Sequence, residues 1–441
     1  MGNWHISLRL LPHFRNALWS VAGQLSNPIA LLLTTPILLR ELGERQYGLW
    51  ILVQSPLVAS QILSVGASVT LVTEVAANRA KSCDAASATS IRNAIALVMA
   101  ISVALSFCLL WALPRIPRVS GSGAVGRLLL LGGGGIVLLA LTEIDNVYTA
   151  ALRGIERFDI AAKFEMVTRV LLTAMTLLMA MEFGVAVYIV WMSVFLMAVK
   201  VSCKAIVVGR KFCTTKLWWP QWKRSEIKRL TGGGLWQVLL SLSSFVFLGL
   251  DRWTVGSLLG APDLARYSVC LQLAQICHTL PSAAFQMLIP WSSRRFASGS
   301  SRPQQPQVLK VALVAAVLCL LFSAVIAFLC GELLRWWISA IFADQNRGLA
   351  VTLISAFALL AVTMPSYYML LGAGAWRYSG LLTATAAGLY VLAMVFVTPK
   401  SVFGFAALRT VYGGVMLLSW WKLGKMSFDL PSPKINAAIT P

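Results

Sequence analysis

The stretch that decides the fold is RELGERQYGLW, residues 40–50, where charged side chains interrupt an otherwise apolar chain. A second stretch of similar design, LLGAPDLARYS, stands at residues 258–268. In each, Leu-Gly ends an apolar segment, a polar turn follows, and a tyrosine begins the next segment. Because a glycine directly after a helix suits a left-handed cap, Gly43 and Gly260 predict short turns between helices.

The composition around these turns is that of a membrane protein. Only 12% of the 441 residues are charged, whereas a soluble domain has about 25%. Apolar stretches of about 20 residues recur, each long enough to cross a ~30 Å hydrocarbon core. A transmembrane β-barrel would instead show alternating strands of about ten residues. The pattern predicts an all-α polytopic membrane protein with about twelve transmembrane helices. We expect spans near residues 15–39, 47–72, 91–113, 126–151, 160–181, 184–207, 232–257, 265–290, 308–330, 348–371, 378–398 and 401–423.

The distribution of basic residues predicts the orientation of the chain. The net charge is +21, and an excess of Lys and Arg marks cytoplasmic loops. Basic residues concentrate in alternate loops, and the central loop is expected to include Lys204. Both termini should therefore face the cytoplasm, with the first span kept as a signal anchor. The loop PRIPRVSGSGAVGR, residues 114–127, opposes this topology because it places three arginines outside.

The two turns also indicate an internal repeat. They lie about half a chain apart, and a basic exit follows each, at Arg79 and Lys81 in one copy and at Arg294 and Arg295 in the other. Six spans per half give both halves the same orientation, which is a parallel repeat. We expect a six-helix lobe over 1–207, a cytoplasmic linker over 208–231, a second six-helix lobe over 232–425 and a cytoplasmic tail over 426–441.

The linker contains a basic, aromatic-rich stretch, GRKFCTTKLWWPQWKRSEIKRL, residues 209–230. In a membrane protein this pattern is typical of contact with anionic lipid headgroups, so we expect anionic membrane lipids as partners and no nucleic acid. The eight cysteines stand singly without a CxxC motif, and there are only three histidines. We expect reduced cysteines, no metal site and no cofactor.

Polar side chains line one face of spans one, two, seven and eight, which are the equivalent pairs of the two halves. The pattern has two interpretations: hydrogen bonds between helices within a lobe, or a hydrophilic cavity between the lobes. Its symmetry favours the cavity. The candidate cavity residues from these faces are Asn27, Gln54, Gln61, Gln237, Gln272, Gln275 and Gln286.

Charged residues inside the spans add further candidates, because such residues are costly in lipid and usually functional. Glu165 and Arg169 have the i, i+4 spacing of an ion pair. A purely structural role, as an intramembrane pair or as an arginine that extends to the interface, stays open for each. The functional interpretation of the arginines is phosphate binding, which the guanidinium geometry suits; these candidates are Arg153, Arg169, Arg252 and Arg409. The carboxylates are candidates for proton or sodium coupling; these are Glu143, Asp145 and Asp251.

Two stretches of the chain resemble a known family. Residues 34–80, with LGERQYGLW and the SVGAS that follows, resemble the first helical pair of bacterial polysaccharide flippases of the Wzx type. These belong to the multidrug/oligosaccharidyl-lipid/polysaccharide exporter superfamily. Residues 250–295 resemble the seventh and eighth helices of that family. The matching residues there are Asp251, Leu259, Gly260, Tyr267 and Pro290.

The resemblance, which extends over residues 15–425, implies a two-lobed transporter of the bacterial cytoplasmic membrane. Its implied cargo is an undecaprenyl-diphosphate-linked oligosaccharide for O-antigen, capsule or exopolysaccharide, moved by alternating access around a cationic cavity. It also implies polymerase and chain-length components of the same pathway as partners. The chain departs from the family in the arginine-rich outer loop and in GGGG, residues 132–135, which indicates a hinge or a close helix contact.

Two alternatives stay open. The first is a small-molecule antiporter of the same superfamily, although its cationic cargo would favour acidic groups in the cavity, and the buried charges here are at least as basic as acidic. The second is a membrane enzyme such as a polysaccharide polymerase, ligase or acyltransferase. The outer loops are short, contain no His or Cys, and carry no nucleophile–base motif, so we expect a protein that is not an enzyme.

Overall fold

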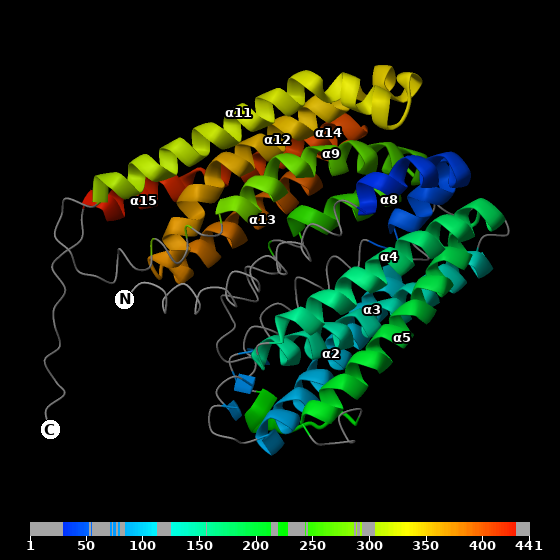
Figure 1. Cartoon of the computed structure of the whole chain (residues 1–441). Helices are drawn as coiled ribbons and strands as arrows, with labels where there is room; N and C mark the ends of the chain where they lie inside the picture. The colour runs from blue at the N-terminus through cyan, green and yellow to red at the C-terminus, as the bar shows by residue number, and fades with distance from the viewer. Residues whose placement is uncertain are drawn as a thin grey trace, which may run out of the picture. The chain divides into compact units, whose positions relative to one another are not determined.

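The computed structural model describes most of the chain, and Figure 1 shows its helices. The described residues are 30–52, 54, 71–72, 74–75, 78–79, 84–112, 125–155, 157–212, 219–227, 243, 246–285, 288, 292 and 305–428. The chain divides into two compact units, residues 1–269 and 270–441. The division between lobes at residues 208–231 stays a prediction.

The described residues of the first unit form a series of helices. Residues 30–52 are helical on both sides of Gly43. The helices that follow in this unit are α2 (Asp84–Ala112), α3 (Val125–Gly154), α4 (Phe158–Phe183), α5 (Ala186–Lys211), the π-helical turn η3 (Val246–Leu250), α8 (Asp251–Leu258) and the first residues of α9 (Ala261–Phe285). Helix α3 packs against α2 and α5, and α4 packs against α5.

The second unit contains the rest of α9 and the helices that follow it. These are α11 (Gln305–Trp337), α12 (Ala340–Gly372), α13 (Trp376–Val397), α14 (Val402–Met416) and α15 (Leu418–Phe428). Helix α12 packs against α11 and α14, and α14 packs against α13. Pro281 lies inside α9 and Pro365 inside α12, which helices in a membrane tolerate.

Local sequence signals explain where several helices begin and end. The hydroxyls of Ser339 and Ser401 accept hydrogen bonds from the backbone N–H groups at the starts of α12 and α14, as N-cap residues do. Gly184 ends α4 with a φ of +59°. Gly43 and Gly260 have φ values of +69° and +103°, so the left-handed turns that the sequence predicts at both positions are confirmed.

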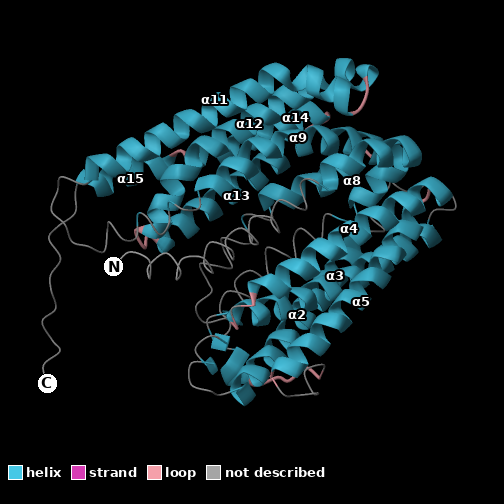
Figure 2. Cartoon of the chain, in the orientation of Figure 1, coloured by secondary structure: helices cyan, strands magenta, loops and turns pink. Residues whose placement is uncertain are grey.

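Eight helices in the described part of the chain are long and apolar enough to cross a membrane, and they coincide with eight of the spans expected from the sequence. Helices make up the described elements, as Figure 2 shows. Many large apolar side chains lie exposed, among them Phe328 on α11 and Phe396 on α13. A soluble protein rarely exposes so much apolar surface, whereas lipid would cover it.

The core of the first unit lies between α2, α3 and α5. Its fully buried members include Ile91, Leu152 and Val208. The four-glycine stretch lies within α3, where a Cβ on Gly134 would stand 2.7 Å from Cγ1 of Val190 on α5. The close helix contact that the sequence indicated for this stretch is therefore confirmed. It brings α3 and α5 together, and charged residues follow it further along both helices.

Candidate functional site

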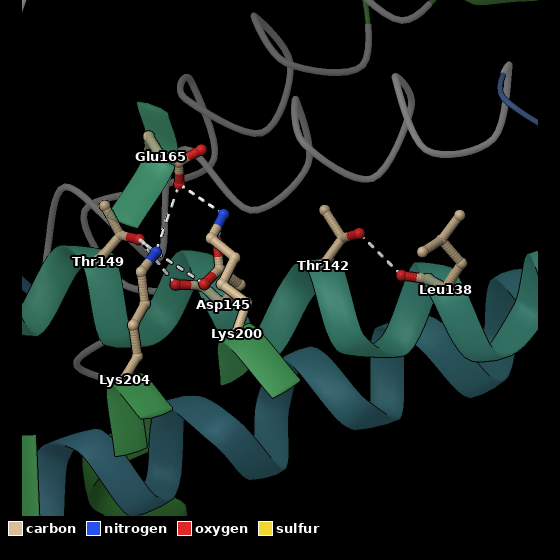
Figure 3. Close-up of polar contacts among 7 residues, drawn as sticks. All are labelled: Leu138, Thr142, Asp145, Thr149, Glu165, Lys200 and Lys204. Carbon is tan, nitrogen blue, oxygen red and sulfur yellow. Dashed lines mark hydrogen bonds and ion pairs between the residues drawn. The ribbon is translucent and has the colours of Figure 1, made fainter. Parts of the chain in front are cut away.

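Helices α3, α4 and α5 bring five polar side chains together, and we call this group the charged cluster (Figure 3). Its members are Asp145 and Thr149 on α3, Glu165 on α4, and Lys200 and Lys204 on α5. On α3 and again on α5 the two members are four residues apart, so each pair lies on one helix face. The cluster therefore depends on the packing of α3 against α5.

Each lysine of the charged cluster bridges both carboxylates. Lys200 Nζ lies 2.8 Å from Asp145 Oδ2 and 2.9 Å from Glu165 Oε1. Lys204 Nζ lies 2.7 Å from Asp145 Oδ1 and 3.3 Å from Glu165 Oε1, and donates to the Thr149 hydroxyl at 2.7 Å. The Thr149 hydroxyl in turn donates to the backbone carbonyl of Asp145. Two ammonium groups and two carboxylates thus form one closed network.

Burial makes this network energetically demanding. The Lys204 side chain is fully buried, and the exposed fractions of Asp145 and Lys200 are 4% and 5%. Glu165 is the least enclosed member, with 30% of its side chain exposed. Removing a charge from water costs several kcal/mol for each ion. Only close ion pairs that leave no charge without a partner offset this cost. The network is matched in charge, but the loss of any one of its four charged members leaves an opposite charge uncompensated.

The ammonium groups of the charged cluster take the positions at Asp145 that a metal cation would need. Both oxygens of Asp145 already contact an ammonium group, so a sodium ion would have to displace a lysine. Among the described residues, no group of three or more His, Cys, Asp or Glu side chains could hold a metal ion.

The sequence located only part of the charged cluster. Asp145 was a candidate, whereas Lys200 and Lys204 were not, and the placement of Lys204 in a cytoplasmic loop was wrong because it lies inside α5. Glu165 pairs with these lysines, while Arg169 lies half-buried one turn further along α4. The missed signal was an i, i+4 pair of lysines on an otherwise apolar helix.

The remaining predicted charges lie elsewhere in the first unit. Arg153, near the end of α3, is exposed, and Glu143 is buried in α3. Asp251 is fully buried and Arg252 nearly so, directly after the π-helical turn. Such turns are frequent at functional sites. The Tyr267 hydroxyl donates to Asp251 Oδ2 at 2.6 Å, and the Arg252 backbone N–H donates to Oδ1 at 2.9 Å.

In the second unit the predicted Arg409 is fully buried in α14, and its guanidinium lies 4.8 Å from the ring centre of Phe357 on α12. His278 on α9 approaches the same ring, with 6.3 Å between ring centres. Gln272 is buried and Gln275 half-buried on α9. A buried guanidinium over an aromatic face is a stabilised cation, and here three helices enclose it.

The other polar candidates can be placed only in part. Gln54 is helical and half-buried. Four candidates lie outside the described residues, namely Asn27, Gln61, Gln237 and Gln286. Hydroxyls on the expected polar faces bond to their own helices: Thr142 donates to the Leu138 carbonyl (Figure 3), and Thr279 donates to the Gln275 carbonyl. These hydroxyls are satisfied locally, so a polar stripe by itself does not define a cavity.

Comparison with solved structures identifies the fold. An inward-facing multidrug resistance MATE family transporter of the MOP superfamily matches with a TM-score of 0.69 and 15% identity, over 92% of this chain and 97% of that one. An outward-facing MATE transporter matches with a TM-score of 0.57 and 17% identity, over 95% and 96%. A MATE protein in the straight conformation matches with a TM-score of 0.56 and 16% identity, over 94% and 95%. The protein is a multi-pass membrane protein with the MATE-like transporter fold of about twelve helices.

The family follows from the sequence itself. Residues 13–296 match the family described as polysaccharide biosynthesis protein. The match extends over more than half of the chain, so the chain belongs to the polysaccharide biosynthesis protein family, and the resemblance read from the two turn stretches is confirmed. A comparison with curated proteins gives no match.

Proposed function

We propose that the protein moves undecaprenyl-diphosphate-linked oligosaccharides from the inner to the outer leaflet of the bacterial cytoplasmic membrane by alternating access. The cargo would serve O-antigen, capsule or exopolysaccharide synthesis, together with polymerase and chain-length components. The observation that carries the proposal is the match to the polysaccharide biosynthesis family in a chain that has a transporter fold. The proposal includes a location in the inner membrane with both termini in the cytoplasm.

The buried arginines support an anionic cargo. Arg252 and Arg409 are buried, and Arg169 is half-buried beside the charged cluster. A guanidinium presents its donors in a planar fork that matches phosphate oxygens. We assign these three residues to diphosphate binding, while the exposed Arg153 lies at a helix end, where it would contact lipid headgroups.

The charged cluster supports energy coupling by protons. Neutralising either carboxylate would weaken its contacts with both ammonium groups and change how α3, α4 and α5 are held together. An intramembrane carboxylate that changes its partners on protonation is a recurring element of transporters. The buried Glu143 and the Tyr267-bound Asp251 are the other candidates for coupling.

Anionic membrane lipids are proposed as partners of the segment at residues 219–227. The exposed fractions of Trp219 and Trp222 are 71% and 61%, and Lys223 and Arg224 beside them are also exposed. Hydrogen bonds to α2 hold the segment: Arg92 Nε donates to the Trp219 carbonyl at 2.8 Å, and the Lys223 N–H donates to Asn93 Oδ1 at 2.6 Å. Exposed tryptophans beside basic groups are typical of the headgroup region.

A second candidate function is the export of small molecules, because the structural neighbours are titled multidrug resistance transporters. At 15–17% identity these neighbours indicate the fold and not the cargo. Enzymatic activity is not part of the proposal, since the family and the fold are those of transporters.

The test is a deletion strain whose lipid-linked saccharides are extracted and assigned to a leaflet. We expect completed repeat units on the carrier to accumulate facing the cytoplasm and to clear when the gene is restored. An unchanged pool with unchanged surface glycan would support the small-molecule exporter. Outward-facing units left unpolymerised would support an enzyme.

Variants of the restored gene test the site. Charge-removing changes at Arg252, Arg169 or Asp145 should impair clearance more than changes at the exposed controls Arg335 and Lys400. Equal tolerance at all five positions would contradict the site assignment.

A further inference from the structure

The two repeated turns meet in the first unit. Glu44 of the first turn and Arg266 of the second form a bidentate ion pair: Arg266 Nη2 lies 3.0 Å from Glu44 Oε2, and Nε lies 3.2 Å from both carboxylate oxygens. This pairing joins residues 222 positions apart, one from each of the two repeated stretches. Two parallel N–H···O bonds fix the relative orientation of the two turns more strictly than one bond would.

A tight backbone contact lies next to the ion pair. A Cβ on Gly48 would collide with the backbone carbonyl of Ala261, so the first turn of α9 rests directly against the helix at Gly48. Further along, a Cβ on Gly256 would stand 3.1 Å from Leu52 Cδ1 and 3.0 Å from Leu264 Cδ2. Leu52 and Leu264 are buried. The contact therefore has two parts. One is the partly exposed ion pair, and the other is a close apolar contact that Gly48 and Gly256 permit because they lack side chains.

Each turn is also supported from its own side. Tyr47 and Tyr267 are both fully buried. Tyr267 donates to Asp251 Oδ2, and Tyr47 lies within 3.4 Å of the Thr35 hydroxyl. In both copies the tyrosine after the turn bonds to a polar side chain on the helix before the turn. The tyrosine contact thus braces each turn against the helix that precedes it.

We propose that this contact is a latch that holds one end of the transport path closed, with Glu44, Arg266 and Gly48 as its positioning residues. The topology expected from the sequence assigns that end to the outer face of the membrane. The role as a gate rests on the proposed function, whereas the contact itself does not. The ion pair suits a latch because its side chains are 41% and 37% exposed, and such pairs are weak and reversible.

Arg266 also has a carboxylate partner ready when the latch opens. Asp263 lies one turn earlier on α9, with Oδ1 4.0 Å from Arg266 Nη1. When Glu44 leaves, Arg266 can turn toward Asp263 without losing all of its ionic contact. An opening step that exchanges one partner for another costs less than one that leaves a charge alone.

The first test measures the contact directly, by hydrogen–deuterium exchange of the purified full-length protein. Gly48→Ala should raise exchange in peptides of both turns, and Gly133→Ala is the control because a Cβ there would meet nothing within 4 Å. Unchanged exchange with Gly48→Ala would overturn the proposal.

The second test uses charge reversal, which keeps the proposal open to refutation even where Gly48→Ala fails to fold. Glu44→Arg and Arg266→Glu should each raise exchange about two- to fivefold, the range expected for loss of a partly exposed ion pair. Combining the two changes should restore slow exchange. If the double variant exchanges as fast as the single ones, the ion pair is not the latch.

The third test joins the latch to transport. Cysteines placed at Glu44 and Arg266 and linked by oxidation should stop clearance of the accumulated lipid-linked saccharide, and reduction should restore it. Full clearance with the link formed, as read by mass spectrometry of the joined peptides, would overturn the gating role. If the wild-type protein itself clears nothing, the proposed function fails, while the exchange experiments still report on the latch.

Discussion

Replacing Asp145 with asparagine tests the charged cluster most sharply. The change keeps the volume of the side chain but removes a carboxylate that contacts both Lys200 and Lys204, at 2.8 and 2.7 Å. The two ammonium groups are then left with Glu165 as their remaining carboxylate in the cluster. Breaking a buried ion pair by removing one partner costs about 3–5 kcal/mol, because the other charge stays buried and uncompensated.

The assay is unfolding of the purified protein in detergent, followed by circular dichroism. Asp145→Asn should lower the free energy of unfolding by about 3–5 kcal/mol. The matched control is Asp344→Asn, which breaks the exposed pair with Arg335 and should cost at most about 1 kcal/mol.

A double variant separates the loss of the pair from general damage to packing. Adding Lys204→Met to Asp145→Asn removes one of the two ammonium groups, so the combined cost should fall below the sum of the single costs by about 0.5–3 kcal/mol. If Asp145→Asn costs no more than Asp344→Asn, or if the two changes in the cluster are additive, the cluster is not the tightly paired network described above.

The turns give three further predictions. Tyr267→Phe should cost about 1.5–3 kcal/mol, because it removes a 2.6 Å bond to the Asp251 carboxylate, and chemical denaturation checks the value. Tyr47→Phe should cost no more than about 1.5 kcal/mol, since its contact with a hydroxyl is 3.4 Å long; equal costs for the two changes would contradict this ranking. Gly260→Ala should cost about 1–2 kcal/mol, because a φ of +103° strains any residue with a Cβ, and Gly388→Ala, a site with open space, is the control in the same measurement.

The sequence was sufficient for eight of the membrane spans and for both turns. Apolar length located the spans, and the two Leu-Gly signals marked turns whose glycines do have positive φ values. These features depend on hydrophobic length and backbone strain, which are local properties of the sequence.

The charged cluster was harder to predict because it depends on contacts between helices that are distant in the sequence. Lys204 lies near the end of its helix, and a lysine at that place usually extends to the interface. Only the packing of α3 against α5 turns it inward, to Asp145 and Thr149. The partners of Glu165 were missed for the same reason. The i, i+4 spacing suggested Arg169, whereas Glu165 accepts hydrogen bonds from lysines 35 and 39 positions away.

The charged cluster also constrains how the chain enters the membrane during synthesis. An unpaired charge near the centre of a membrane helix costs about 2.5–3.5 kcal/mol for insertion, and α5 carries Lys200 near its middle and Lys204 one turn further on. The chain emerges with α3 and α4 first, so Asp145 and Glu165 are already in place when these lysines arrive. The lysines of α5 can thus pair with these carboxylates as the helix is inserted. In a ribosome-bound fragment that ends before residue 200, Asp145 and Glu165 would lack both of these lysine partners.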